Sequence, residues 1–351
     1  MNAHRYLPYS DGVESVPAGE AEDIQQVVQA LMSILARSQA RSGQFRADVH
    51  VKTHGYAQGE LRVLPNLPEE LAQGLFAQVG VHSALVRFSN SAPQPHPDAI
   101  PDGRGMAIKV LGVAGDMGLI DEQRGPTQDF VMINHPVFFV RNVKDYLRVE
   151  QVLVEADDSS LATVQGALTD GNWNPLQWHW TEALAAAGIA GRFPVHPASN
   201  TYFSMAPIRF GNYVAKYRAK PVEDRRESTV DLILRLGYQA DAMRLALEET
   251  LRTHEVSFEF QVQLRTSEQT MPIEDATVEW PETESPYRTV AHLLIPQQDI
   301  AGNLLRDDFR SLAFNVWHAL AAHRPLGGIN RVRRAAYPLS SAWRRQQVVP
   351  T

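Results

Sequence analysis

Arg333-Arg334-Ala335-Ala336-Tyr337 places a phenol one helical turn after an arginine, and the interpretation of the chain depends on this stretch. On a helix, Arg333 and Tyr337 share a face. A free tyrosine has a pKa of about 10, and a cation one turn away lowers that pKa by about 1–3 units in a partly buried site. A tyrosinate stabilised in this way is the axial ligand that some ferric haem proteins require. The alternative is a surface helix whose arginines are merely solvated.

The composition is that of an ordinary globular protein, with 351 residues, 44% hydrophobic and 21% charged. This length suits one large domain or two. The net charge of −7 does not favour non-specific binding to nucleic acid or to anionic membranes. Cysteine is absent, which excludes disulfides, iron–sulfur clusters, thiolate-ligated haem and cysteine nucleophiles.

The N-terminal sequence lacks the apolar region of a signal peptide, and no run approaches about 18 apolar residues. A cytoplasmic protein without a membrane span is therefore expected. Residues 1–44 are interpreted as an N-terminal arm and helix, and residues 45–351 as a single domain, because no convincing linker or internal repeat interrupts them.

Hydrophobic periodicity predicts both helices and strands. Helical spacing covers residues 22–40, 240–253, 309–321 and 330–343, together with much of 144–190. Alternation predicts strands at 49–52, 59–63, 84–88, 105–111, 130–133, 137–140, 202–210, 213–217, 232–236, 256–264 and 288–295. Gly211-Asn212 is a hairpin signal. Many strands joined by hairpins and followed by helices predict an α+β fold around an antiparallel sheet or closed barrel.

His50 is the first candidate for chemistry, because it lies within the predicted strand 49–52 and faces inward together with Asp48 and Lys52. An inward histidine in a strand is usually a core or edge residue. As a catalytic residue it would accept a proton from a peroxide and return it to the departing oxygen, which suits a side chain that titrates near neutrality.

Three further segments carry candidate residues. Arg87 stands at a strand end, where it can pair with a carboxylate, and Ser89 can hydrogen-bond a neighbouring histidine ring. Asn134 offers an uncharged amide that holds a peroxide oxygen without titrating, although Phe138 beside it would more often be plain core. An ordinary strand with a charged edge is the alternative for Arg87.

In this order, the motifs resemble those of the haem catalase family. They are Val49-His50 with Lys52, Arg87-Phe88-Ser89, Arg104-Gly105 with Ala107 and Lys109, Asn134 before Pro136 and Phe138-Phe139, and Arg324-Pro325-Leu326-Gly327 followed by Arg333 and Tyr337-Pro338. The resemblance runs from about Phe45 to Arg345, nearly the whole chain.

The resemblance implies an antiparallel β-barrel of the catalase type, with surrounding helices and a buried haem b. It makes His50 the distal catalytic histidine, Asn134 the distal amide and Ser89 the residue that orients the histidine ring. Tyr337 becomes the iron ligand, with Arg333 as its charge partner. The remaining cofactor contacts are the propionate-binding Arg87 and Arg344, with Phe138 and Val49 also contacting haem.

The chain is closest to the small branch of that family, called mini-catalases or catalase-related peroxidases. A shorter approach to the haem is expected, so hydrogen peroxide, organic hydroperoxides and an organic electron donor are the implied partners of a homo-oligomer. One alternative is a fatty-acid hydroperoxide isomerase of the allene oxide synthase type. Those enzymes tend to have a hydroxyl residue before the distal histidine, where this chain has Val49. A non-catalytic haem sensor or carrier is the other alternative.

Overall fold

The computed structural model describes residues 6–43, 50–92, 95–117, 126–156, 163, 180–222 and 240–346. Their nine strands form one antiparallel sheet in the order β5-β4-β3-β2-β1-β9-β8-β7-β6. Because β5 also pairs with β7, eight strands close into a barrel, and β6 forms a hairpin with β7. The strands are β1 (Thr53–Val63), β2 (Gly80–Asn90), β3 (Arg104–Leu111), β4 (Thr127–Ile133), β5 (Tyr202–Phe203), β6 (Ile208–Phe210), β7 (Tyr213–Pro221), β8 (Val256–Leu264) and β9 (Arg288–Ile295).

The barrel interior is a packed aromatic core. Phe130 of β4 lies 4.6 Å from Phe260 of β8, measured between ring centroids, and Phe76 stacks on Phe260 at 5.6 Å. Each of these rings is almost completely buried. Since side chains fill the interior, a ligand site must lie on the outer face of the barrel, where the alternate residues of the strands point.

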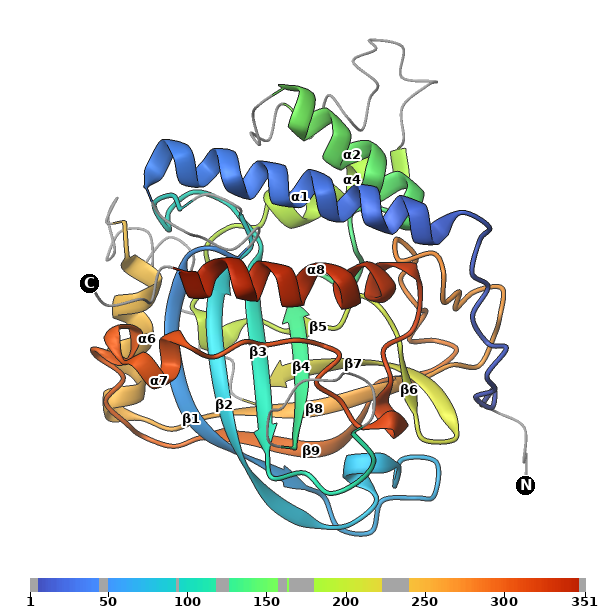
Figure 1. Cartoon of the computed structure of the whole chain (residues 1–351). Helices are drawn as coiled ribbons and strands as arrows, with labels where there is room; N and C mark the ends of the chain where they lie inside the picture. Colours follow the sequence, from blue (N-terminus) through green and yellow to red (C-terminus); the bar gives the residue numbers. More distant parts are fainter. Residues whose placement is uncertain are drawn as a thin grey trace.

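Six α-helices occur in the described residues: α1 (Glu20–Ser42), α2 (Val143–Ala156), α4 (Trp180–Ala190), α6 (Ala242–Thr253), α7 (Asp307–Arg310) and α8 (Gly328–Arg345). Short 3-10 turns are η1 (Gly74–Phe76), η3 (Pro197–Ser199), η4 (Asn303–Leu305) and η5 (Ala321–His323). Within these ranges no helix is both long and apolar enough to cross a membrane. In Figure 1, α8 lies across β2, β3 and β4, and α1 lies on its outer side.

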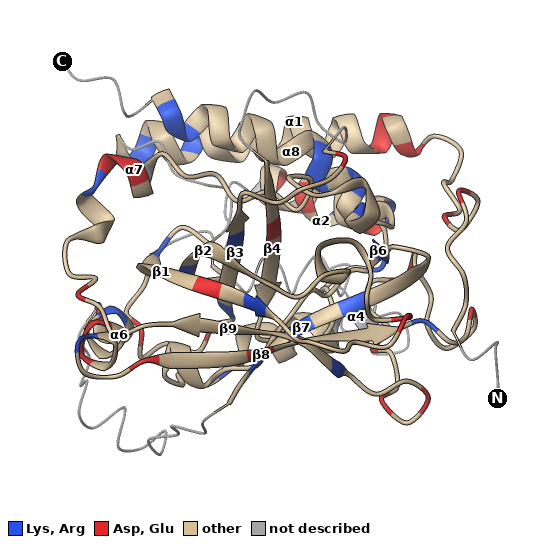
Figure 2. Cartoon of the chain, turned by 90° about the horizontal axis from the view of Figure 1, so that it is seen from below, with Lys and Arg blue, Asp and Glu red and all other residues tan. Residues whose placement is uncertain are grey.

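The helices α1, α2 and α8 hold one another through an apolar cluster, formed by Val27, Leu31, Val143, Leu147, Val332 and Ala336. An ion-pair network then fixes the start of α8. Arg331 contacts Glu20 at 2.5 Å, Glu14 at 2.5 Å and Glu274 at 2.7 Å. The hydrogen bonds to Glu20 and Glu274 raise the pKa of Arg331 further above its usual range against the effect of burial. Figure 2 shows basic segments toward both ends of α8.

Most of the predicted elements are confirmed, including the hairpin turn at Gly211-Asn212 and the bounds of β8 and β9. Residues 137–140 are not a strand, and residues 50–52 precede β1. The predicted strand 232–236 lies outside the described residues.

The helix predicted over 309–321 is wrong, because only Asp307–Arg310 is α-helical and a segment of irregular backbone and turns follows. Buried side chains of β4 take the backbone N–H groups that a helix would use. The N–H of Asn315 donates to Asp129 at 2.9 Å, and that of Leu320 donates to Gln128 at 3.0 Å. Tertiary hydrogen bonds therefore override the helical periodicity of the segment.

Candidate active site

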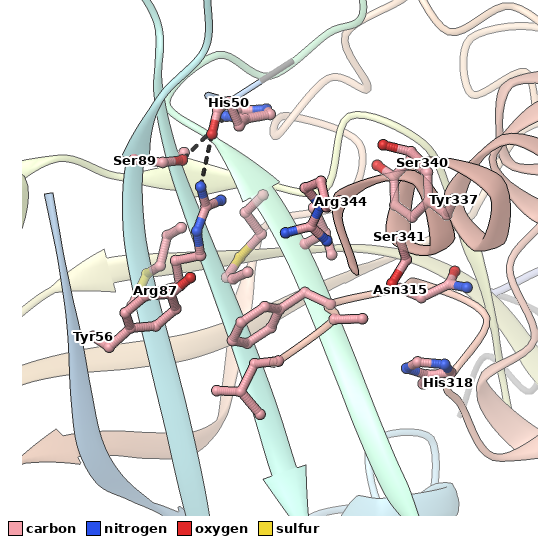
Figure 3. Close-up of a pocket in the computed structure, with 18 of the residues that line it drawn as sticks. His50, Tyr56, Arg87, Ser89, Asn315, His318, Tyr337, Ser340, Ser341 and Arg344 are labelled. Atoms are coloured by element: carbon pink, nitrogen blue, oxygen red, sulfur yellow. Dashed lines mark hydrogen bonds between the residues drawn. The ribbon is translucent and has the colours of Figure 1, made fainter. Parts of the chain in front are cut away.

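A partly open cavity of about 100 Å³ lies between the outer face of the barrel, α8 and the segment after α7. The strands contribute His50 (before β1), Tyr56, Arg87, Ser89, Gly105, Met106, Ala107, Val131 and Met132. The segment after α7 contributes Leu312, Ala313, Phe314, Asn315 and His318, and α8 contributes Tyr337, Pro338, Ser340, Ser341 and Arg344. Figure 3 shows the strand residues on one side of the cavity and the helix residues on the other.

His50 adopts a left-handed backbone conformation, with φ of 56°. This conformation is uncommon outside glycine, and asparagine, aspartate and histidine adopt it most readily. The N–H of His50 donates to Ser91 O at 3.2 Å, and its carbonyl accepts from Arg87 Nη2 at 2.7 Å. Residues held in such conformations cluster at functional sites, because the surroundings must offset a cost of about 1–3 kcal/mol.

The ring of His50 is fixed through Nδ1, which lies against the carbonyl oxygen of Asn90 and 3.2 Å from Ser89 Oγ. A carbonyl oxygen only accepts, so Nδ1 carries the proton in this contact. The lone pair of the neutral ring is therefore on Nε2. Burial, followed by the nearby charge of Arg87, lowers the pKa of His50 from its usual 6.5 to about 4. His50 lines the cavity, and its low pKa leaves the ring neutral at pH 7.

Gly105 of β3 is required by the close approach of the His50 ring. A Cβ at this position would lie 2.6 Å from His50 Nδ1 and 2.7 Å from Ser89 Oγ. Both values are shorter than real Cβ contacts, so one of the two side chains would have to move. Gly105 pairs with Ser89 across β2 and β3, which places the three residues in one layer.

Arg87 joins the His50 turn to β1. Its Nη2 donates to the His50 carbonyl and, at 2.8 Å, to Thr53 Oγ1, while Nε donates to the same hydroxyl at 3.1 Å. Within the described residues Nη1 makes no hydrogen bond, and the side chain lines the cavity. Arg87 thus both holds the histidine turn and presents a cation to a ligand.

Helix α8 contributes Tyr337 and Arg344, which stand seven residues apart and line the same cavity. Pro338 follows Tyr337 inside the helix. Since proline lacks an N–H, it removes one bond of the helical ladder next to the tyrosine. The structure therefore brings five predicted site residues together around one space: His50, Arg87, Ser89, Tyr337 and Arg344.

Three predicted residues, Arg333, Phe138 and Asn134, are placed outside this cavity. Arg333 is a buried residue of α8, where Nη1 donates to Asn330 Oδ1 at 3.0 Å and the guanidinium lies 5.5 Å from the Phe138 ring. Phe138 packs on Phe139 with ring centroids 4.6 Å apart. A fourth residue, Val49, lies outside the described residues.

Asn134 is buried at the end of β4, and its amide is already engaged. Its Oδ1 accepts from the backbone N–H of Arg104 at 2.8 Å, and its Nδ2 donates to Asn200 Oδ1 at 3.1 Å. It does not appear among the residues that line the cavity. Its catalytic role stays a prediction.

Two polar residues of the cavity wall, Asn315 and His318 in the segment after α7, are not predicted from the sequence. A buried ion pair supports them: Lys109 Nζ lies 2.6 Å from both carboxylate oxygens of Asp129, and His318 Nδ1 lies 3.2 Å from Oδ2. Lys109 and Asp129 are direct partners across β3 and β4. In the sequence, the only signal for this support was a lysine and an aspartate, Lys109 and Asp129, in two strands that are largely apolar.

No family model matches the chain, and no curated protein sequence matches it either. Solved structures do share its fold. A fungal catalase is 18% identical with a TM-score of 0.62, over 89% of this chain and 61% of that chain. Catalase A from Saccharomyces cerevisiae is 15% identical with a TM-score of 0.62, over 99% of this chain and 68% of that chain. A bacterial catalase is 17% identical with a TM-score of 0.59, over 97% and 64%.

The chain thus spans between about three fifths and two thirds of the length of the catalases that it matches. At these identities the likeness concerns the path of the backbone. The closed eight-stranded antiparallel barrel with α8 across its outer face has the fold of the catalases.

Proposed function

We propose that this chain binds haem b and uses it to consume hydrogen peroxide or an organic hydroperoxide. The observation that carries the proposal is the single cavity lined by His50, Arg87, Tyr337 and Arg344, on the outer face of a barrel with the catalase fold. A base, a phenol and two cations that surround one space are the groups that a tyrosinate-ligated haem enzyme needs.

The cavity residues fit the cofactor in charge and polarity. Apolar side chains suited to a macrocycle come from the barrel residues Met106, Ala107, Val131 and Met132. Arg87 and Arg344 supply cations for two propionates. Tyr337 supplies the oxygen ligand, and Arg333, one turn earlier in α8, favours its phenolate form. When bound, the haem supplies the redox chemistry, and the protein supplies placement and electrostatics.

His50 moves the proton in this proposal. Its Nδ1–H is held by Asn90, so Nε2 accepts a proton from the peroxide and returns it to the departing oxygen. Ser89 keeps the ring in place through its contact with Nδ1. For Asn134 to steady the peroxide, as the resemblance implies, its Nδ2 must exchange its bond to Asn200 for one to the peroxide.

Within this class we assign peroxidase turnover with an organic donor beside dismutation of hydrogen peroxide. The support is the apolar wall of Leu312, Ala313 and Phe314, which gives a bulky donor a surface to contact. The two alternative functions are isomerisation of a fatty-acid hydroperoxide and haem binding without turnover. The experiment described next distinguishes both of them from peroxidase turnover.

The test compares the wild type with Tyr337→Phe after reconstitution with ferric haem, and uses Tyr213→Phe, which lies outside the cavity, as the control. Spectra report the iron ligand. Oxygen release from hydrogen peroxide, guaiacol oxidation and conversion of a fatty-acid hydroperoxide report the three reactions. We expect Tyr337→Phe to lose haem or to shift its spectrum strongly, and the control to behave like the wild type. An unchanged ferric spectrum in Tyr337→Phe would rule out this ligand, and a wild type that binds no haem would overturn the proposal.

A further inference from the structure

Asn315 lies in the segment after α7 and lines the cavity, although only 3% of the residue is exposed. Figure 3 shows it below Tyr337 and Ser341. Such a strongly buried polar side chain needs a partner for each of its polar groups, because an unmade hydrogen bond costs about 1–3 kcal/mol.

All but one of the polar groups of Asn315 have a partner. Its backbone N–H donates to Asp129 Oδ2 at 2.9 Å, its carbonyl accepts from the His318 N–H at 2.8 Å, and its Oδ1 accepts from the Trp317 N–H at 3.0 Å. The Trp317 N–H is a donor, so the amide orientation is settled: the oxygen faces Trp317 and Nδ2 remains.

Among the described residues, Nδ2 of Asn315 donates no hydrogen bond. It also does not belong to the polar atoms that are fully buried without a partner. The small accessible surface of Asn315 therefore includes Nδ2, which faces the cavity. Since Oδ1 is used by Trp317, this side chain offers only N–H donors to a ligand.

The donor is held rigidly. Asp129, which anchors the Asn315 backbone, has no exposed side-chain surface and is fixed by Lys109 through two contacts of 2.6 Å. A donor that is already in place loses little entropy when it binds an acceptor.

Ser341 is a second donor on the same cavity. It follows Tyr337 by one turn of α8, and its hydroxyl makes no hydrogen bond within the described part of the chain. The usual bond from a helical serine to the carbonyl four residues earlier is also not made. Two neutral donors, one from the segment after α7 and one from α8, therefore border one space.

We propose that Asn315 and Ser341 bind an acceptor oxygen on the occupant of the cavity, which deepens the function proposed above and rests on it. The acceptor is either a carboxylate oxygen of the cofactor or an oxygen of the organic donor. Both sources share the chemistry of an oxygen lone pair that two neutral donors recognise.

The test uses Asn315→Ser, Asn315→Asp and Ser341→Ala. Both Asn315 variants keep a side-chain oxygen for the Trp317 N–H, so the turn is retained. Asn315→Asp removes the N–H donor altogether, and Asn315→Ser replaces the amide N–H with the O–H of a shorter side chain. Ser341→Ala changes a residue of α8 and leaves the turn at Asn315 and Trp317 unaltered. Asn142→Ser is the matched control, because Asn142 also accepts a backbone N–H, from Asp145 at 3.0 Å, and lies outside the cavity.

Two dissociation constants are measured: that of ferric haem, by titration of the apoprotein, and that of guaiacol, from the difference spectrum of the haem-loaded protein. If the acceptor belongs to the cofactor, the haem Kd rises about tenfold, the value of one hydrogen bond. The rise is then larger for Asn315→Asp, whose carboxylate repels the propionate.

If the acceptor belongs to the donor, the guaiacol Kd rises about tenfold and the haem Kd is unchanged. Both Kd values within twofold of wild type in all three variants would overturn the inference and leave haem binding by the wild type intact. A wild type without haem affinity would overturn the proposed function first, and this inference with it.

Discussion

The Arg87 guanidinium holds the carbonyl oxygen of His50 at 2.7 Å, and this bond sustains the left-handed turn that carries the histidine. Arg87 also lines the cavity, and its charge contributes to the low pKa of the ring. One side chain therefore connects three properties of the site: the position of the base, its protonation state and the charge offered to a ligand.

Arg87→Lys should weaken haem binding and slow the reaction with peroxide together. An ammonium cannot bridge the His50 carbonyl and Thr53 as the guanidinium does. Lost hydrogen bonds of a charged group cost about 1.5–3 kcal/mol, or about 10–150-fold in haem Kd. Haem titration and rapid mixing with peroxide measure the two effects. Arg62→Lys on β1, an exposed arginine paired with Glu60, is the control. Wild-type values for Arg87→Lys would contradict this role.

Gly105→Ala should displace the His50 ring and spare haem binding. The added methyl would lie 2.6 Å from Nδ1 of the ring. Loss of a well-placed base slows the peroxide step by about 10²–10⁴-fold at most. Gly80→Ala serves as the comparison, because its Cβ would meet only His82, at 3.6 Å. Equal rates for the two variants would show that His50 does not carry the proton.

The peroxide reaction should retain its rate down to low pH. His50 acts as a base only when neutral, and burial lowers its pKa from 6.5 to about 4. The rate should therefore be flat from pH 7 to about 5 and fall tenfold per unit below about 4. Short pH jumps from neutral solution separate this limb from acid unfolding. An acid limb centred near the ordinary histidine value would refute the assignment of the base.

Asp129→Asn should destabilise the protein by about 3–5 kcal/mol, because it leaves the buried Lys109 ammonium without its counter-charge. Urea unfolding of the apoprotein measures the change. The double variant Lys109→Met/Asp129→Leu should recover only part of the loss, since Asp129 also accepts from the Asn315 N–H and lies 3.2 Å from His318 Nδ1. Glu60→Gln at the exposed Arg62 pair should change stability little. A full recovery in the double variant would show that the ion pair is the only role of Asp129.

The sequence by itself determined most of the strands, several of the helices and the spacing of α8. β8, β9 and the hairpin at Gly211-Asn212 follow from alternation and turn residues, which are local properties of the chain. Tyr337 and Arg344 line one cavity because a single helix carries both of them. Local periodicity is sufficient for such placements.

Tertiary structure decided the rest. His50 was expected on a strand, but a bond from Arg87 to its carbonyl and a bond from its N–H to the Ser91 carbonyl hold it in a left-handed turn. Asn134 was expected to face a peroxide, but Asn200 and the backbone of Arg104 engage its amide. In each case the partner lies tens of residues away in the sequence, so no local pattern records the contact.

The segment after α7 shows the physical reason most directly. Its periodicity predicts a helix, but Asp129 and Gln128 of β4 accept the backbone N–H groups of Asn315 and Leu320, and the backbone is irregular where it lines the cavity. Closure of the barrel brings these strands beside a segment almost two hundred residues later in the sequence. Local propensity is worth only a few tenths of a kcal/mol per residue, roughly, and buried hydrogen bonds outweigh it. The cavity and its polar wall therefore exist only in the folded chain.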